Sequence, residues 1–473
     1  MSPVYYSLPL LAISIISMIA FDNLPSFSVY SQPVIVNDQS LVINKLAGNL
    51  DSPSSMEIIG NDILITQKDD GKVKLVRDSV LFKYPIIDLN TYSNGIESGL
   101  KSIASQIRNN DTYVFLLFSE SLGGDTDKSE TVGVNYKVYR YIWNSSGLEL
   151  TNETSIVSLP TINQVNTGGE MIVGPDNQLY ITIGDLNEQG KEQNIPADKL
   201  NDLFKSFLNN DIKSGAILRF DFNGSPSTGN PFTEKGFESY FAYGIRNSLG
   251  LAFDPVTKNL WDTEQGPGSA DEINLVRPGL NSGWKAIQGS SNKTCCSDSM
   301  QLSQNIFKLY KVNGSYYDDP KVVFENSRNL TAITFQDLES LGSQYENTMF
   351  VGDLQGNIFN FHLNEDRNDI VSVNATTGFV FAKWFGPISD LKVGPNGDVY
   401  VLTYSDDYDF PYSQNSGSLY RIKAVNTPTE FSESNKITIE LIGLILTFLI
   451  ILAIFVSFRF KSLFRKIRIK KEN

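Results

Sequence analysis

The sequence predicts an all-β protein, a six-bladed β-propeller with a C-terminal single transmembrane helix. Three features predict it: short strand-like runs recur between turn signals, one turn-and-strand motif repeats, and a long uncharged apolar run lies near the C-terminus. Regularly spaced strands with an internal repeat are typical of sheets arranged radially around an axis. The chain has 473 residues, 41% of them hydrophobic, which is ample for one large domain of this kind.

The repeated motif is the most direct sign of radial blades. It reads GPDNQLYITIGD from Gly174 and GPNGDVYVLTYSD from Gly394, with a looser copy, DPVTKNLWDTEQG, from Asp254. Each copy opens with residues that favour a tight turn and continues as a strand. Long loops, such as the insert at residues 198–208, would gather at one mouth of the channel, where ligands bind. We expect six strand groups, at residues 58–76, 99–143, 171–222, 249–276, 332–363 and 391–422.

Both ends of the chain carry apolar segments outside the propeller, which we expect to occupy residues 32–425. Residues 1–31 begin with an uncharged apolar run and indicate a secretory signal peptide, with a retained N-terminal anchor as the alternative. After a short stalk at residues 426–436, residues 437–458 match the roughly 17–25 apolar residues of a transmembrane helix. The tail, residues 459–473, carries seven Lys or Arg, so the positive-inside rule predicts a cytoplasmic C-terminus and a propeller outside the cell membrane.

The charge distribution and the glycosylation sequons fit an external domain. The formal net charge is −14, and because the tail contributes +6, the rest of the chain sums to −20, which argues against nucleic acid as a partner. Eight N-x-Ser/Thr sequons predict a glycoprotein, and none lies in either apolar end. They stand at Asn110, Asn144, Asn152, Asn223, Asn292, Asn313, Asn329 and Asn374.

The two cysteines of the chain are adjacent, at Cys295 and Cys296. Adjacent Cα atoms lie about 3.8 Å apart, below the usual disulfide range, so a strained vicinal disulfide, two free thiols and a link between chains all stay open. The single histidine, His362, lies in a strand-like run. No metal site of the Cys/His type can therefore be built from this sequence.

The segment at residues 240–275 holds the residues best suited to a ligand site. Gly266 and Pro267 interrupt a strand and bare backbone carbonyls, while Arg246 places a fixed cation beside the amide of Asn247. Carbonyls, carboxylates and an arginine gathered at strand ends suit a hard cation next to an anionic ligand.

The run YGIRNSLGLAFDP, followed by TEQGPGSADEINLV and by NSGW from Asn281, resembles the glucose/sorbosone dehydrogenase family. The resemblance extends, more weakly, from about residue 51 to about residue 424. It implies a six-bladed β-propeller that oxidises aldoses at a CH–OH group with pyrroloquinoline quinone (PQQ) and calcium, so a small-molecule sugar is the implied substrate. It also implies that Arg246 and Asn247 contact the cofactor, and that the backbone carbonyls of Gly266 and Pro267 bind calcium.

The sequence departs from the family pattern at several positions. Asn166 stands where the family has the histidine that removes the sugar proton, and an amide cannot act as a general base near neutral pH. Glu170, four residues further on, is a candidate substitute. Gln355 stands at the position of a cofactor-binding lysine, and Pro387 and Ser389 stand at two arginine positions. We therefore expect little positive charge for a tricarboxylate cofactor.

Three other carboxylates receive structural interpretations. Asp271 and Glu272 begin a strand, and we expect them to hold the adjoining loop by hydrogen bonds rather than to catalyse. Asp185 closes the end of another strand, where we interpret it as a turn residue.

Three functions follow from these observations. The first is an extracellular quinoprotein sugar dehydrogenase. The second is a catalytically inactive extracellular propeller that binds a surface glycan or an envelope protein, because Asn166, Gln355 and Ser389 replace family site residues. The third is a calcium-dependent lactonase-like hydrolase, which rests on analogy of fold alone. The sequence specifies no protein partner.

Overall fold

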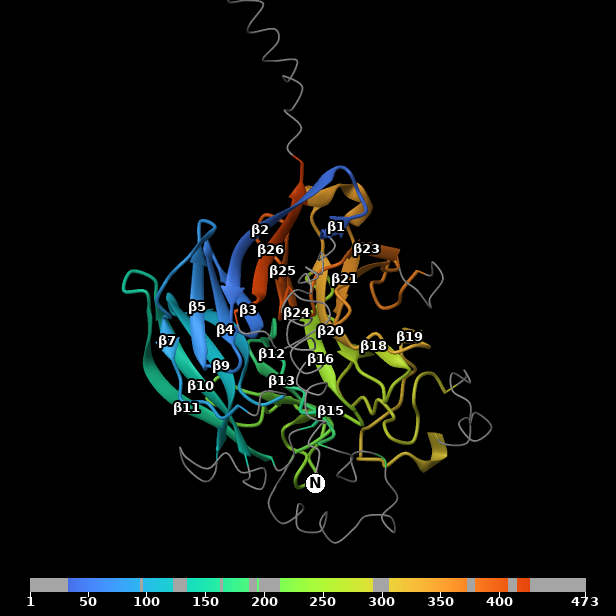
Figure 1. The fold of residues 1–473 in the computed structure, drawn as a ribbon. Coiled ribbons are helices and arrows are strands. Elements are labelled where there is room, and N and C mark those ends of the chain that lie inside the picture. The colour runs from blue at the N-terminus through green and yellow to red at the C-terminus, as the bar shows by residue number, and fades with distance from the viewer. Residues whose placement is uncertain are drawn as a thin grey trace, which may run out of the picture. The chain divides into compact units, whose positions relative to one another are not determined.

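The computed structural model describes residues 33–93, 97–121, 134–161, 165–186, 194, 213–291, 306–371, 379–406 and 415–425. The chain divides into a compact unit that ends at Lys423 and a second unit from Ala424, of which only two residues are described. Within the described ranges the first unit forms six antiparallel sheets, each a blade, around a common axis (Figure 1). The prediction of an all-β fold with six blades is confirmed.

The first three blades run in chain order from their innermost strand outward. The first blade comprises β3 (Pro53–Ile59), β4 (Asp62–Gln67), β5 (Lys72–Arg77) and β6 (Val80–Leu81), with β7 (Ile87–Asp88) also paired to β5. The second comprises β8 (Leu100–Arg108), β9 (Asp111–Ser121), β10 (Val134–Asn144) and β11 (Glu149–Thr161). The third comprises β12 (Met171–Val173), β13 (Leu179–Ile183), β14 (Ala216–Phe220) and β15 (Tyr240–Tyr243).

The last three blades repeat this order, and the N-terminal strands complete two of them. The fourth blade comprises β16 (Ser248–Phe253), β17 (Leu260–Glu264), β18 (Asp271–Val276) and β19 (Val322–Phe324). The fifth comprises β20 (Leu330–Gln336), β21 (Thr348–Asp353), β22 (Ile358–His362), β23 (Phe379–Lys383) and β1 (Ile35–Val36), with the short 3₁₀ turns η4 (Glu339–Leu341) and η5 (Ser343–Tyr345) after β20. The sixth comprises β24 (Ile388–Val393), β25 (Val399–Thr403), β26 (Gly417–Ala424) and β2 (Leu41–Leu50).

The blades form a closed ring. The innermost strand of each blade contacts that of the next, in the order β3, β8, β12, β16, β20 and β24, and β24 contacts β3 again. The outermost strand of the sixth blade is β2, which comes from the N-terminal part of the propeller and pairs with β26 from its C-terminal part. Closure therefore depends on pairing between the two ends of the domain.

The predicted repeat marks equivalent turns in two blades. In the third blade the turn between β12 and β13 has a hydrogen bond from the N–H of Asn177 to the carbonyl of Gly174, and Asn177 has a φ of 61°. In the sixth blade the turn between β24 and β25 has the same bond from Gly397 to Gly394, and Gly397 has a φ of 78°. Glycine and asparagine adopt this left-handed conformation most readily, so the motif selects the turn.

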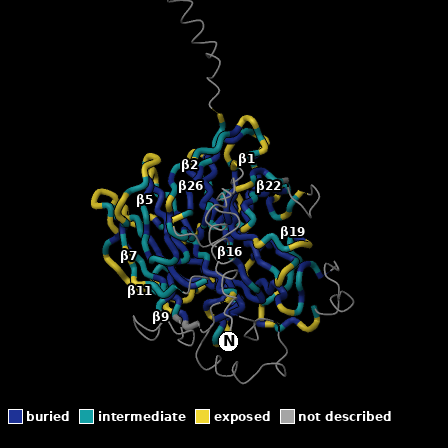
Figure 2. Tube along the Cα trace, in the orientation of Figure 1, coloured by how far each residue is buried: buried dark blue, intermediate teal, exposed yellow. Residues whose placement is uncertain are grey.

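Hydrophobic residues are buried between neighbouring blades rather than at one centre. Phe115 of β9 and Ile181 of β13 belong to one cluster, between the second and third blades. Trp261 of β17 and Val351 of β21 belong to another, between the fourth and fifth. In Figure 2 buried residues fill the blades, and exposed residues lie mainly at their outer turns. Since burying one such side chain stabilises a fold by about 1.5–3 kcal/mol, these contacts hold the ring together.

Several predicted segments lie outside the described residues. They are residues 1–31, the insert at 198–208, Cys295 and Cys296, the proposed span at 437–458 and the tail at 459–473. Where the structure describes the chain, it contains no helix with the length and apolar character needed to cross a bilayer. Among the sequons in the described ranges, the asparagines of five are exposed: Asn110, Asn152, Asn223, Asn313 and Asn329.

Candidate functional site

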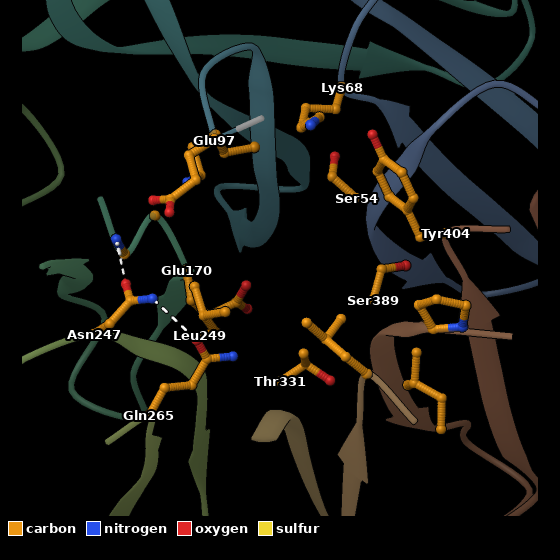
Figure 3. A pocket seen from close by; sticks show the side chains of 16 residues that line it. Ser54, Lys68, Glu97, Glu170, Asn247, Leu249, Gln265, Thr331, Ser389 and Tyr404 are labelled. Carbon is orange, nitrogen blue, oxygen red and sulfur yellow. Dashed lines mark hydrogen bonds between the residues drawn. The ribbon is translucent and has the colours of Figure 1, made fainter. Parts of the chain in front are cut away.

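A cavity of about 490 Å³ lies at the mouth of the central channel. All six blades contribute to it, each through a residue in or directly before its innermost strand (Figure 3). These inner strands begin at the same end of the ring, so their first residues meet there. We call this cavity the central pocket. One lining residue from each blade, in chain order, is Ser54, Lys101, Glu170, Asn247, Thr331 and Ser389.

Two side-chain amides form a fixed part of the pocket wall. Asn247 accepts a hydrogen bond from the N–H of Gly168 at 3.0 Å and donates one to Oε1 of Gln265 at 3.2 Å (Figure 3). Gln265 in turn donates to the carbonyl of Leu330 at 3.1 Å. Both amides are buried, with 4% and 9% of their surface exposed. Their orientation is therefore set before any ligand enters.

Two lysines line the pocket together with the carboxyl groups of Glu97 and Glu170, so the lysines give it no clear excess of positive charge. Lys68 forms an ion pair with Asp69 at 3.5 Å, and its ammonium lies 5.0 Å from the ring centre of Tyr404. Burial lowers the pKa of Lys68, while Asp69 opposes the shift. Lys101 comes from β8, and burial lowers its pKa to about 8. The carboxylate of Glu97 lies in the same wall and accepts the N–H of Thr167 at 2.7 Å.

Glu170 belongs to an ionic cluster in the channel. Burial raises its pKa to about 8, and Lys392 opposes this shift. Burial also raises the pKa of Asp390 and of Glu57, with Lys392 again opposing. For Lys392 itself, burial disfavours the charged form, yet the three carboxyl groups raise its pKa above the ordinary value. The positive charge of Lys392 thus interacts with three carboxyl groups, those of Asp390, Glu170 and Glu57.

Asn166 does not line the pocket. Its amide donates to Oδ1 of Asp185 at 2.9 Å, and Oδ2 of Asp185 accepts Nε1–H of Trp284 at 2.9 Å. Asp185 is fully buried, so these bonds satisfy a carboxylate that would otherwise destabilise the fold. Asp185 therefore does more than end a strand: it fixes the loop that carries Asn166 against the fourth blade.

Arg246, Gly266 and Pro267 lie beside the pocket rather than in its wall. They line a much smaller adjacent cavity of about 10 Å³, which shares Gln265 with the central pocket. The guanidinium of Arg246 donates to the carbonyls of Gln265 at 3.0 Å and Gly266 at 3.2 Å, and lies 5.6 Å from the ring centre of Trp284. The carbonyl predicted to bind calcium thus faces a cationic group already.

The prediction that Asp271 and Glu272 hold loops is confirmed. Asp271 accepts the N–H of Gly266 at 2.9 Å and the N–H groups of Arg328 at 2.7 Å and Asn329 at 2.6 Å. Glu272 accepts the N–H of Gly289 at 2.6 Å. Asp271 therefore sets the position of the Gly266 carbonyl. Among the described residues no group of three or more His, Cys, Asp or Glu is arranged to hold a metal ion.

Gln355 lies next to the pocket but points away from it. Its neighbour Leu354 lines the cavity. The side chain of Gln355 accepts a hydrogen bond from Arg328 and donates one to the carbonyl of Ser327, both at 3.4 Å. Of the positions chosen for their departure from the family, Pro387 and Ser389 do line the pocket.

The structure therefore brings together only part of the predicted set. Glu170 and Asn247 line the central pocket, whereas Asn166, Arg246 and Gln355 do not. Among the lining residues that sequence reasoning missed are Lys68, Glu97, Lys101 and Gln265. The signal for the lysines was a charged residue at the end of, or inside, an otherwise apolar strand-like run. Such a lysine is usually solvent-facing, so the signal was not specific.

The fold and this pocket define a class of protein, a six-bladed propeller with a cavity to which all six blades contribute. Residues 50–410 match the family model described as Glucose / Sorbosone dehydrogenase. The match covers most of the chain, and the protein belongs to the glucose/sorbosone dehydrogenase family, as the sequence motifs predicted.

Relatives agree with this assignment, and a solved structure agrees with the fold. The chain is 28% identical over 295 residues to quinoprotein glucose dehydrogenase B of Acinetobacter calcoaceticus, covering 59% of each protein. It is 27% identical over 392 residues to an uncharacterized protein of Synechocystis sp. (strain PCC 6803), covering 79% of this chain and 84% of that protein. The PQQ-bound aldose sugar dehydrogenase of Streptomyces coelicolor shares the fold, with a TM-score of 0.58 and 20% identity over 84% of this chain and 99% of that one.

Proposed function

We propose that this protein is a membrane-anchored extracellular PQQ-dependent aldose dehydrogenase, an oxidoreductase that acts on the CH–OH group of a small-molecule sugar. The observation that carries the proposal is the central pocket, where fixed amides and a buried lysine face one cavity at the channel mouth. The name of the Acinetobacter calcoaceticus relative supports a quinone cofactor.

The residues present fit an anionic quinone. Lys68 supplies positive charge to the wall, and Asn247 and Gln265 present amides whose orientation is fixed by hydrogen bonds. The backbone carbonyls of Gly266 and Pro267 are the oxygen atoms that would hold calcium, and the guanidinium of Arg246 donates to that of Gly266. When bound, the quinone would accept the two electrons that leave the sugar C–H bond.

The location is part of the same proposal. Residues 437–458 would anchor the chain, the basic tail would lie in the cytoplasm, and the propeller would lie outside. The exposed sequon asparagines are consistent with glycosylation of an external domain. Protease treatment of intact cells should remove the propeller from the membrane, and an intact chain after such treatment would contradict this topology.

The decisive experiment is a titration of the full-length chain in detergent with PQQ, in calcium and in excess chelator. Binding is followed by absorbance, and turnover by dye reduction with a panel of aldoses. Lys68→Met should weaken cofactor binding, while Lys83→Met, which changes an exposed lysine, should not. Calcium-dependent binding with aldose oxidation is the expected result. No cofactor binding would overturn the proposal and leave an inactive propeller that recognises a surface glycan.

A further inference from the structure

Lys101 is a lysine held in the pocket wall at a fixed place. It is the second residue of β8, and its stem lies along Gly169. A Cβ added at Gly169 would come within 2.7 Å of Cδ and 2.9 Å of Nζ, so a larger residue there would displace the lysine from this position. Nζ donates a hydrogen bond to Oγ1 of Thr167 at 2.7 Å and lies 6.0 Å from the ring centre of Tyr136. The amine therefore has one defined position beside the cavity.

Burial of Lys101 in the pocket wall disfavours the charged form of its amine. Burial lowers its pKa to about 8; Glu97 and Glu170 oppose this shift, and Lys68 adds to it. Roughly half of such an amine is neutral at pH 8 and roughly a tenth at pH 7, whereas an ordinary lysine, with a pKa of about 10.4, is almost fully charged at both. A neutral amine has a lone pair, so Lys101 can accept a proton where an ordinary lysine cannot.

We propose that Lys101 accepts the hydroxyl proton when the central pocket oxidises a sugar. The inference rests on the proposed function. Oxidation of a CH–OH group to a carbonyl releases one proton from oxygen and a hydride from carbon. The O–H proton passes to the lone pair of Nζ, the hydride carries two electrons to the quinone cofactor, and the carbon–oxygen bond becomes double. The resulting ammonium then returns its proton to water, which restores the amine.

Geometry separates Lys101 from the other two groups considered for this role. Asn166 has no basic lone pair, and its amide is bound to Asp185. Glu170 accepts a hydrogen bond from Ser102 at 3.4 Å and interacts with Lys392 in the channel cluster. Lys101 instead lines the pocket and donates to the hydroxyl of Thr167, the residue directly after Asn166. The proton acceptor is thus supplied by the second blade rather than by the third.

The experiment uses the full-length chain loaded with PQQ and calcium. The pH dependence of kcat/KM is measured for the wild type, Lys101→Met, Lys101→Arg and Glu170→Gln. We expect the wild-type value to rise as the pH passes through the pKa of Lys101, because the neutral amine is the active form. Both Lys101 variants should lose about 10²–10⁴-fold in kcat and lose the inflection, since methionine has no base and arginine stays charged. Glu170→Gln should keep the inflection.

Two further readouts make the outcomes distinct. Brief amine acetylation of the unloaded chain, read by mass spectrometry against pH, should show Lys101 gaining reactivity with a midpoint near 8, well below that of surface lysines. Lys101→Ala should be partly rescued by added methylamine. If PQQ does not bind the wild type, both proposals fall. If PQQ binds and sugar is oxidised but the Lys101 variants keep rate and inflection, or Glu170→Gln alone removes the inflection, only the role of Lys101 is overturned.

Discussion

Arg246 and Gly266 form a side-chain to backbone contact at 3.2 Å that places a guanidinium at the carbonyl predicted to bind calcium. The same guanidinium bonds to the carbonyl of Gln265, whose side chain lines the central pocket. In the absence of metal, the loop after β17 therefore has its own cation. Calcium at the Gly266 carbonyl would lie close to the guanidinium of Arg246, and the two positive charges would repel each other.

The first prediction concerns this contact. Arg246→Ala removes the donor from two partly buried carbonyls, so in excess chelator we expect a loss of about 1–3 kcal/mol of unfolding free energy. Urea unfolding followed by circular dichroism measures it. Added calcium should restore more stability to the variant than to the wild type, because in the variant calcium does not compete with a guanidinium. Equal stability of the two chains in chelator would show that the contact contributes nothing.

The second prediction concerns a buried ion pair between blades. Arg367 and Asp254 are 4% and 0% exposed, and their side chains meet at 2.7 Å. Asp254 lies in the turn between β16 and β17, and Arg367 follows β22 in the fifth blade. Arg367→Met leaves a buried carboxylate unpaired and should cost about 3–5 kcal/mol. Lys45→Ala, which breaks the exposed pair with Asp406, is the control and should cost less than about 1 kcal/mol.

The third prediction is the pH dependence of that pair. Burial opposes ionisation of Asp254, yet hydrogen bonds from Arg367 and Thr257 lower its pKa below the ordinary value. A lowered carboxyl pKa adds stability that is present above the ordinary pKa of about 4 and is lost as the pH falls through the folded value. Asp254→Asn should therefore destabilise the protein at pH 7 and flatten the acid limb of its stability curve. If the unfolding free energies of the wild type and of Asp254→Asn fall equally steeply as the pH is lowered, this account is contradicted.

The fourth prediction tests the room that Gly169 leaves for Lys101. Gly169→Ala should displace the lysine and shift the midpoint of Lys101 acetylation towards that of surface lysines, because the stem can no longer lie in the wall. Gly236→Ala is the matched control. Gly236 also has a positive φ, of 91°, but no atom lies within 4 Å of the added Cβ. Both variants carry backbone strain, and only the first should alter the reactivity of Lys101.

The fifth prediction concerns ring closure. Deletion of residues 1–50 removes β1 and β2 and leaves β26 as an exposed edge strand, which favours association between molecules. We expect thermal unfolding to lose its cooperativity, and we expect oligomers to appear in size-exclusion chromatography. Deletion of residues 1–32, which retains both strands, is the control. A monomeric, cooperatively unfolding chain without β2 would show that the other blades hold the ring closed.

Local patterns in the sequence were sufficient to predict the blades. Turn residues such as Asn177 and Gly397 define hairpins from contacts a few residues apart, so six strand groups were recognisable. The closing strand β2 was not predicted, because its partner β26 lies more than 360 residues further along the chain and no local signal connects them.

A site residue was predicted only where a residue of the sequence motif also directs its side chain into the pocket. Asn247 was found because it stands in a family motif and also faces the pocket. Lys101 and Lys68 were missed because a strand alternates its faces, and which face meets the channel is known only once the ring is assembled. Arg246 shows the converse, since a motif position does not determine where a long side chain points.

The participation of β2 in the sixth blade has a consequence for biosynthesis. The ribosome completes β2 early, but its partner β26 ends at Ala424, near the end of the propeller sequence. During most of translation the nascent chain therefore carries β2 with nothing beside it, and the ring can close only after almost the entire domain has emerged. Blades one to four can form in order as they appear, whereas assembly of the sixth is a late event that joins the oldest and newest parts of the chain.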